Sequence, residues 1–158
     1  MADATQIQLV LFELQGELYA IEAAKVQEIV VRQPETRVPR TPGYVVGIVN
    51  LRGRVVPTVD LLRRFDLGDT TGTATQVIVV ELRGGLVGIL VDLVTEVLNV
   101  PFAQMEPPPE TVVLGPVRAV SAILEVGGRL ASVLDLDLAF SREEMAQEEA
   151  LQALRQKA

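Results

Sequence analysis

Carboxylates are the only side chains in this sequence whose spacing suggests active-site chemistry. Asp135 and Asp137 alternate along a predicted strand and would share one face, and Asp60 follows a similar strand. The chain of 158 residues contains no His and no Cys, which excludes thiol nucleophiles, imidazole bases, disulfides and thiolate or imidazole metal ligands. Two carboxylates without a third acid hold a metal poorly, so we expect capping or solvent-exposed roles and no cofactor.

Catalytic and nucleotide-binding motifs are also missing. The segment Asp-Thr-Thr-Gly at 69–72 is similar to the Asp-Thr-Gly of aspartic proteases, but the extra Thr spoils the spacing and the catalytic dyad needs a second such loop. No glycine-rich fingerprint for phosphates or dinucleotides occurs. The glycines therefore do not cradle phosphates, and the aspartic-protease interpretation is set aside.

The charge of the chain is strongly segregated. The net charge is −7, yet residues 32–64 contain seven arginines and only two acids. Binding to nucleic acid depends on Lys and Arg that neutralise phosphates, so the overall charge predicts no nucleic-acid partner. The basic block is either a solvated loop or a surface for an acidic protein partner.

Neither a signal peptide nor a membrane span is expected. The first residues lack a basic region followed by an apolar stretch, and the longest apolar runs are far shorter than the roughly 18 residues of a membrane helix. We expect a cytoplasmic protein without direct membrane insertion.

Branched aliphatic residues dominate the sequence and occur in short runs. Val, Leu and Ile together account for 53 residues, and Gly, Pro or Asp bound most of the runs, which is typical of antiparallel β structure. Segment 22–30 is amphipathic, and 66–75 has the composition of an exposed, mobile connection. Four hairpins are predicted, pairing 7–14 with 18–21, 44–51 with 54–59, 76–82 with 86–91, and 119–126 with 129–134.

The chain also resembles itself. At an offset of 68 residues, 8–31 and 76–99 share eight identities, and at an offset of 75 residues, 44–65 matches 119–140. We interpret this as an internal duplication with units of about 6–65 and 76–140. A capping-box pattern at 141–144 predicts a C-terminal helix within 141–158.

The duplication separates structural positions from candidate functional ones. Gly53 with Gly128, and Asp60 with Asp135, are equal in both units, so we interpret Asp60, Gly128 and Asp135 as turn and cap residues. Arg52 has no such counterpart, because Gly127 occupies the equivalent position. Arg52 is either a solvated turn residue or is held by a carboxylate. Glu28 is the candidate partner, unless it is only a polar face residue like its counterpart Glu96.

Three motifs then carry a family resemblance. Val-Gln-Glu-Ile at 26–29, Thr-Pro at 41–42, and the Asn-Leu-Arg-Gly hairpin followed by Pro-x-x-Asp-Leu at 50–61 resemble the CheW family of chemotaxis coupling proteins. The resemblance covers about residues 6–140 and implies one mainly β, CheW-like domain. It implies two SH3-like five-stranded β-barrel lobes around a shared core, with short helices, and leaves open whether the lobes exchange strands.

The resemblance implies a scaffold that works by contact. Members are non-enzymatic adaptors that couple the cytoplasmic tips of chemoreceptors (methyl-accepting chemotaxis proteins) to the regulatory domain of the CheA histidine kinase in membrane-associated receptor arrays. We expect a monomer in isolation. The implied partner-binding residues are Val26, Glu28, Gly47, Asn50, Leu51, Arg52, Gly53 and Val55.

Two alternatives remain from the sequence. The chain could serve as the coupling protein of a parallel pathway for pilus or gliding motility. It could also be a small-ligand-binding β-barrel, which a deep pocket around Asp60, Asp135 and Asp137 would favour.

Overall fold

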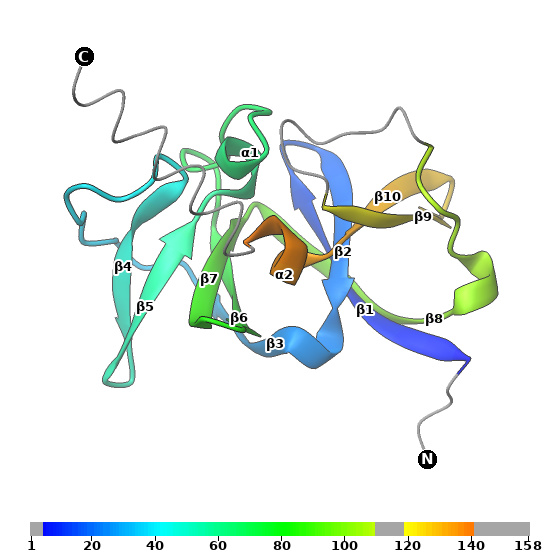
Figure 1. The fold of residues 1–158 in the computed structure, drawn as a ribbon, viewed down its shortest axis with the longest axis horizontal. Helices are drawn as coiled ribbons and strands as arrows, with labels where there is room; N and C mark the ends of the chain where they lie inside the picture. The colour runs from blue at the N-terminus through cyan, green and yellow to red at the C-terminus, as the bar shows by residue number, and fades with distance from the viewer. Residues whose placement is uncertain (1–4, 110–118, 141–158) are drawn as a thin grey trace.

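Ten strands form two five-stranded sheets in the computed structural model, which describes residues 5–109 and 119–140 (Figure 1). The strand order is β8-β1-β2-β10-β9 in the first sheet and β3-β6-β7-β5-β4 in the second. The strands are β1 (Gln6–Leu14), β2 (Glu17–Glu22), β3 (Val26–Val31), β4 (Val45–Leu51), β5 (Arg54–Val59), β6 (Gln76–Leu82), β7 (Gly85–Val91), β8 (Leu93–Pro101), β9 (Val120–Val126) and β10 (Arg129–Leu134). The short helices are η1 (Ala23–Lys25), α1 (Leu61–Arg64), η2 (Phe102–Gln104) and α2 (Leu136–Ala139).

Each sheet takes strands from both halves of the chain. Hairpin β1–β2 pairs with β8 on one side and, in parallel, with β10 on the other, whereas hairpin β6–β7 pairs with β3 and, in parallel, with β5. The chain passes between the sheets at η1 and at Asp92, which lies between β7 and β8. Hairpin β1–β2 therefore lies in the sheet that contains β8, β9 and β10 of the second half. Hairpin β6–β7 lies in the sheet that contains β3, β4 and β5 of the first half.

Isolated bridges close both sheets. The segment after β3 forms a bridge from Thr36 to Ile48 in β4, and the segment after η2 forms one from Glu106 to Ile123 in β9. These bridges join the two outer strands of each sheet, as closure of a small barrel requires. The predicted mainly β fold with two five-stranded lobes is confirmed, while the duplication stays a prediction.

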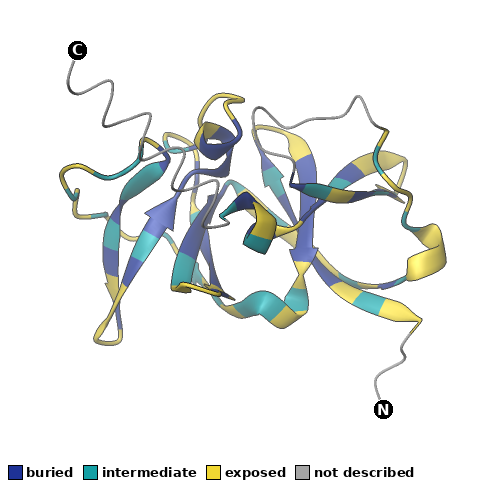
Figure 2. Cartoon of the chain, in the orientation of Figure 1, coloured by how far each residue is buried: buried dark blue, intermediate teal, exposed yellow. Residues whose placement is uncertain are grey.

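The largest apolar cluster lies between the two barrels. Phe12 and Tyr19 from the first sheet pack there with Ile78 from the second and with Phe65, which follows α1. Two smaller clusters fill the barrels themselves. On one face of strand β1, Leu9 and Leu11 pack inside the first barrel. On the other face, Phe12 and its neighbours pack in the shared cluster, so both faces of the strand are buried (Figure 2). This explains why its apolar residues run without alternation.

Helices α1 and α2 begin at equivalent aspartates and meet beside this cluster. Asp60 Oδ1 accepts hydrogen bonds from the amides of Leu62 and Arg63, and Asp135 Oδ1 accepts one from Leu138. The buried Arg64 of α1 donates from Nε to the carbonyl of Ala139 in α2, at 2.9 Å. A guanidinium thus joins the ends of the two halves.

The connection 66–75 is mostly exposed, as expected, and carboxylates hold its Thr residues. Thr70 is fully buried; its amide donates to Asp60 Oδ2 at 2.8 Å, and its hydroxyl donates to Asp92 Oδ1 at 2.7 Å. The hydroxyl of Thr73 also donates to Asp92, at 2.6 Å. The Thr residues of this connection thus satisfy two carboxylates of the crossing region.

The amphipathic segment 22–30 contains the short helix η1 and then strand β3, and its alternation is that of a strand with one face outward. The predicted C-terminal helix and its capping box at 141–144 lie outside the described residues.

Substitution of Gly47 tests whether the second barrel closes through the bridge between Thr36 and Ile48. A Cβ at Gly47 would lie 2.6 Å from the carbonyl oxygen of Thr36, whereas a Cβ at Gly72 would meet nothing within 4 Å. We expect Gly47→Ala to lower the free energy of unfolding by about 1–3 kcal/mol, because the Thr36 backbone must move. Gly72→Ala should change it by less than about 1 kcal/mol. Urea denaturation of both variants measures the difference, and equal effects would show that the bridge tolerates a side chain.

Candidate functional site

The hairpin between β4 and β5 ends in a two-residue turn formed by Arg52 and Gly53. Leu51 pairs with Arg54, and both turn residues have positive φ, +54° and +83°, as in a type I′ turn. Asn50 Oδ1 accepts a hydrogen bond from the amide of Gly53 at 2.8 Å. The left-handed region is unfavourable for residues with a Cβ other than Asn and Asp, so Arg52 occupies a costly position.

The equivalent turn of the first barrel avoids that cost. Gly127 and Gly128 join β9 to β10 with φ of +56° and +82°, so the same backbone is made with glycine where the second barrel has Arg52. The requirement of the turn therefore does not account for the arginine.

Glu28 of β3 holds Arg52 in place across the gap between the two outer strands of the second sheet, β3 and β4. Arg52 Nη2 lies 3.1 Å from Glu28 Oε2, so of the two arrangements that the sequence left open, the structure has the one in which a carboxylate holds the arginine. The arginine side chain is 83% exposed, whereas the glutamate side chain is 28% exposed. An exposed pair of this kind adds only about 0–1 kcal/mol to stability, so its effect is to position the guanidinium.

Some of the other predicted site residues are exposed and others are buried. Asn50, Gly53 and Val55 are exposed around the turn, and Val26 is half-buried at the start of β3. Gly47 and Leu51 are buried: Gly47 allows the Thr36 bridge, and the side chain of Leu51 packs inside the second barrel. These two position the hairpin, and the side chain of Leu51 is not available for contact with a partner.

Exposed aliphatic residues lie on the same two strands as the ion pair. Val31 is 76% exposed and Val55 65% exposed, and Ile29 also faces outward from β3. Ile29 follows Glu28, and Val55 pairs across the hairpin with Asn50. The sequence prediction missed Ile29 and Val31, although the alternation of β3 gives a signal for them.

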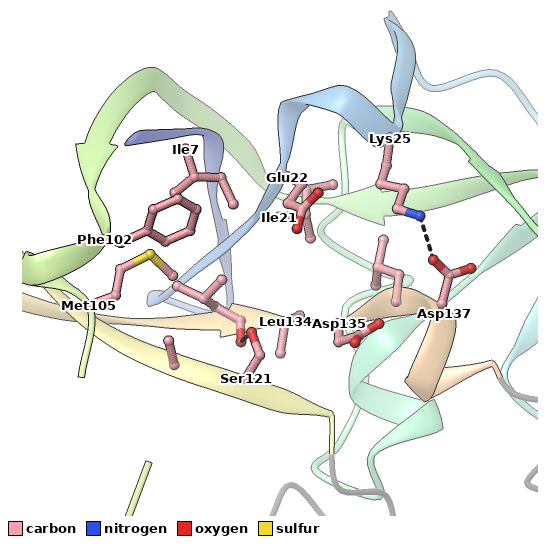
Figure 3. A pocket seen from close by; sticks show the side chains of 13 residues that line it. Ile7, Ile21, Glu22, Lys25, Phe102, Met105, Ser121, Leu134, Asp135 and Asp137 are labelled. Atoms are coloured by element: carbon pink, nitrogen blue, oxygen red, sulfur yellow. Dashed lines mark hydrogen bonds and ion pairs between the residues drawn. The ribbon is translucent and has the colours of Figure 1, made fainter. Parts of the chain in front are cut away.

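A cavity of about 400 Å³ lies in the first barrel's part of the molecule (Figure 3). Asp135 and Asp137 line it together with Phe102 and Met105, but Asp60 does not. Asp60 is fully buried and accepts bonds from α1 and from the 66–75 connection. The three carboxylates expected of a small-ligand site therefore do not converge.

Lys25 neutralises the cavity's outer carboxylate. Its Nζ lies 2.5 Å from Asp137 Oδ2, as the dashed line in Figure 3 shows. The hydrogen bond from Lys25 lowers the pKa of Asp137, and the same hydrogen bond raises the pKa of Lys25. Because Asp135 caps α2, both aspartates at the cavity are engaged within the fold, and Glu22 is the third acid of the lining. The described residues contain no group of three or more acids that could hold a metal ion.

Comparison with known proteins identifies the family. The model of the CheW-like domain matches residues 8–144. The chain is 36% identical over 140 residues to the chemotaxis protein CheW of Klebsiella aerogenes, covering 88% of this chain and 84% of that protein. It belongs to the CheW family.

Other CheW-like proteins agree. The chemotaxis protein CheW of Bacillus subtilis is 32% identical over 136 residues, covering 85% of this chain and 87% of the relative. The crystal structure of the scaffolding protein TtCheW from Thermoanaerobacter tengcongensis superposes with a TM-score of 0.78 at 31% identity, covering 90% and 92% of the two chains. The CheW fold and its scaffold class thus extend to this chain. Among the described residues, no helix is long and apolar enough to span a membrane.

Arg52→Gly tests whether the arginine of this CheW-like hairpin serves stability. Glycine fits the positive φ, and the lost ion pair contributes little, so we expect an unchanged or slightly raised melting temperature. A double-mutant cycle with Glu28→Ala and Arg52→Ala should give a coupling below about 1 kcal/mol. A melting temperature lowered by several degrees in Arg52→Gly would assign the arginine to the fold.

Asp137→Asn tests the ion pair at the cavity of the CheW domain. A carboxyl whose pKa is lowered on folding stabilises the protein above its unfolded pKa, about 4, and loses that contribution as the pH falls through the folded pKa. The variant should therefore be less stable than the wild type at pH 7, and the difference should shrink below about pH 4. Asp66→Asn is the matched control, since the described structure shows no ion pair there. Urea midpoints across this range measure both, and a difference independent of pH would refute the assignment.

Proposed function

We propose that this chain is a non-enzymatic adaptor that couples the cytoplasmic tips of chemoreceptors to the CheA histidine kinase. Its place would be the cytoplasmic side of membrane-associated receptor arrays. Family membership and the similarity to a solved scaffolding protein support the proposal.

Arg52 is the observation that carries the proposal. It occupies a left-handed turn position that the equivalent turn fills with glycine, and Glu28 orients its exposed guanidinium at 3.1 Å. An unfavourable conformation that the fold does not need suggests a role in binding. We assign to Arg52 a contact with a partner, and to Glu28 the positioning of that contact.

The surface beside the pair suits protein contact. Val55 exposes a branched side chain next to the hairpin tip, and Ile29 and Val31 expose theirs on β3, the strand that carries Glu28. Docking of this kind uses a few apolar anchors for affinity and a charge for register. One face of the second barrel would bind the regulatory domain of CheA, and the receptor hairpin would bind alongside. An adaptor that contacts both partners biases the state of each.

A coupling role in a parallel motility pathway is the second candidate. The chain is 35% identical over 75 residues to the protein FrzA of Myxococcus xanthus, which covers 47% of each chain. The match is shorter than those to the chemotaxis proteins, so we place this candidate second.

Charge reversal at the pair tests the adaptor. Arg52→Glu or Glu28→Arg should abolish kinase activation in a reconstituted receptor array while leaving the melting temperature nearly unchanged, because the pair positions a contact and adds little stability. Arg129→Glu is the control, since Arg129 forms a comparable exposed pair with Glu13 in the other barrel, at 2.8 Å. The Arg129→Glu variant should activate the kinase as the wild type does. Equal loss in all three variants would remove the specific role of Arg52.

Binding is measured separately by calorimetric titration with the CheA regulatory domain. The wild type should bind at micromolar concentration, and Arg52→Glu should bind at least tenfold more weakly, as expected for one charge-assisted contact of about 1.5–3 kcal/mol. No detectable binding of the wild type to the cognate domain would refute the adaptor assignment.

A further inference from the structure

A second charged feature lies at the other end of β4. A cleft of about 740 Å³ is bounded by the loop before β4 and by the start of that strand, and we call it the arginine cleft. Arg32, Arg37, Arg40 and Arg63 line it, with Glu35 as the only acid among the lining residues that the structure describes. This concentration of positive charge belongs to a chain whose net charge is −7.

Two of the four arginines are committed to the fold. Arg32 pairs through Nε with Glu35 Oε1 at 2.7 Å and also donates to the carbonyls of Thr71 and Ala74. Arg63 pairs with Asp69 at 3.0 Å and donates to the carbonyl of Gly43 at 3.2 Å. These contacts fix the walls of the cleft and leave little of their hydrogen-bonding capacity for a ligand.

Arg37 and Arg40 have no such commitment. Both are exposed, and neither forms a hydrogen bond or an ion pair with another residue of the described ranges 5–109 and 119–140. Arg40 has φ of +63°, a conformation that glycine adopts more readily. A strained backbone that presents an unpaired cation at the rim of a cleft indicates a binding role.

The lining of the cleft selects the class of ligand. Guanidinium groups bind carboxylates with paired hydrogen bonds, and the half-buried Val38, Val45 and Val46 add apolar surface to the lining. Within 5–109 and 119–140, the cleft is lined by no aromatic side chain on which a base could stack, which disfavours single-stranded nucleic acid. Its volume also far exceeds that of a single small anion. These features fit a short peptide in which acids alternate with aliphatic residues.

The arginine cleft is separate from the Arg52 site. Val45 lines the cleft at the start of β4, and Arg52 follows the end of that strand, about 20 Å away at the rise of an extended chain. Figure 1 shows the hairpin tip and the loop before β4 at opposite ends of the strand. A partner on one site leaves the other accessible.

We propose that the arginine cleft binds an acidic peptide segment of a partner protein, with carboxylates on Arg37 and Arg40 and aliphatic side chains against Val45 and Val46. This goes beyond the adaptor function, because it adds a second contact surface and holds whether or not the Arg52 site binds the kinase. It also assigns a role to the basic block of residues 32–64.

Fluorescence anisotropy with the labelled peptide Glu-Val-Glu-Val-Glu-Val-Glu tests the cleft in the full chain. The wild type should bind it, the Gln-Val counterpart should bind at least tenfold more weakly, and 0.5 M NaCl should weaken the acidic peptide similarly. Arg37→Glu with Arg40→Glu should reduce affinity at least tenfold. The matched control, Arg54→Glu with Arg83→Glu, makes the same charge change at exposed arginines outside the cleft and should retain affinity.

Arg40→Gly separates binding from folding. Glycine fits the positive φ, so the melting temperature should stay the same or rise while peptide affinity falls severalfold. Undetectable binding of the acidic peptide at millimolar concentration, or equal loss in both double variants, would overturn the proposal. If the wild type bound oligothymidine more tightly than the acidic peptide, and the Arg37→Glu, Arg40→Glu variant lost that binding, the cleft would be assigned to nucleic acid instead. Self-association lost in that variant would assign it to a second copy of the chain.

Discussion

Burial of β1 on both faces is the constraint on which the rest of the structure depends. Its alternate residues fill the first barrel and the cluster shared with the second barrel, so neither can form without it. Strand β6 has the same position in the other sheet, with Val77 and Val79 inside the barrel and Ile78 in the shared cluster. The exchanged hairpins thus make two barrels into one cooperative unit.

This arrangement sets the geometry of the surfaces. Because the two barrels share the largest apolar cluster, rotation of one barrel against the other would disrupt that cluster. The hairpin carrying Arg52 extends from β4 and β5, whose closure against the Thr36 segment requires the bare backbone of Gly47. A rigid frame of this kind holds a charged turn at a defined distance from the rest of the molecule, which is what a scaffold needs.

Local pattern predicted most of the fold and the central contact of the site. Turn glycines and aliphatic runs located the four hairpins, and comparison of Arg52 with Gly127 pointed to the pair with Glu28. The sequence analysis did not predict β3 and β8 as strands. The exposed residues on one face of β3 gave that stretch the pattern of a short amphipathic segment. The hairpin exchange, the buried Thr70 and the close approach at Gly47 depend on residues distant in the chain, which periodicity does not report.

The hairpin exchange also has a consequence for synthesis of the chain on the ribosome. Hairpin β1–β2 is complete at Glu22, but its neighbours β8 and β10 end only at Pro101 and Leu134. At roughly 5–20 residues per second, the first hairpin waits on the order of ten seconds for a partner, with both faces apolar. During that interval β1 is an exposed, aggregation-prone strand. The nascent protein therefore depends on rapid completion of translation, or on a chaperone, far more than two independent barrels joined by a linker would.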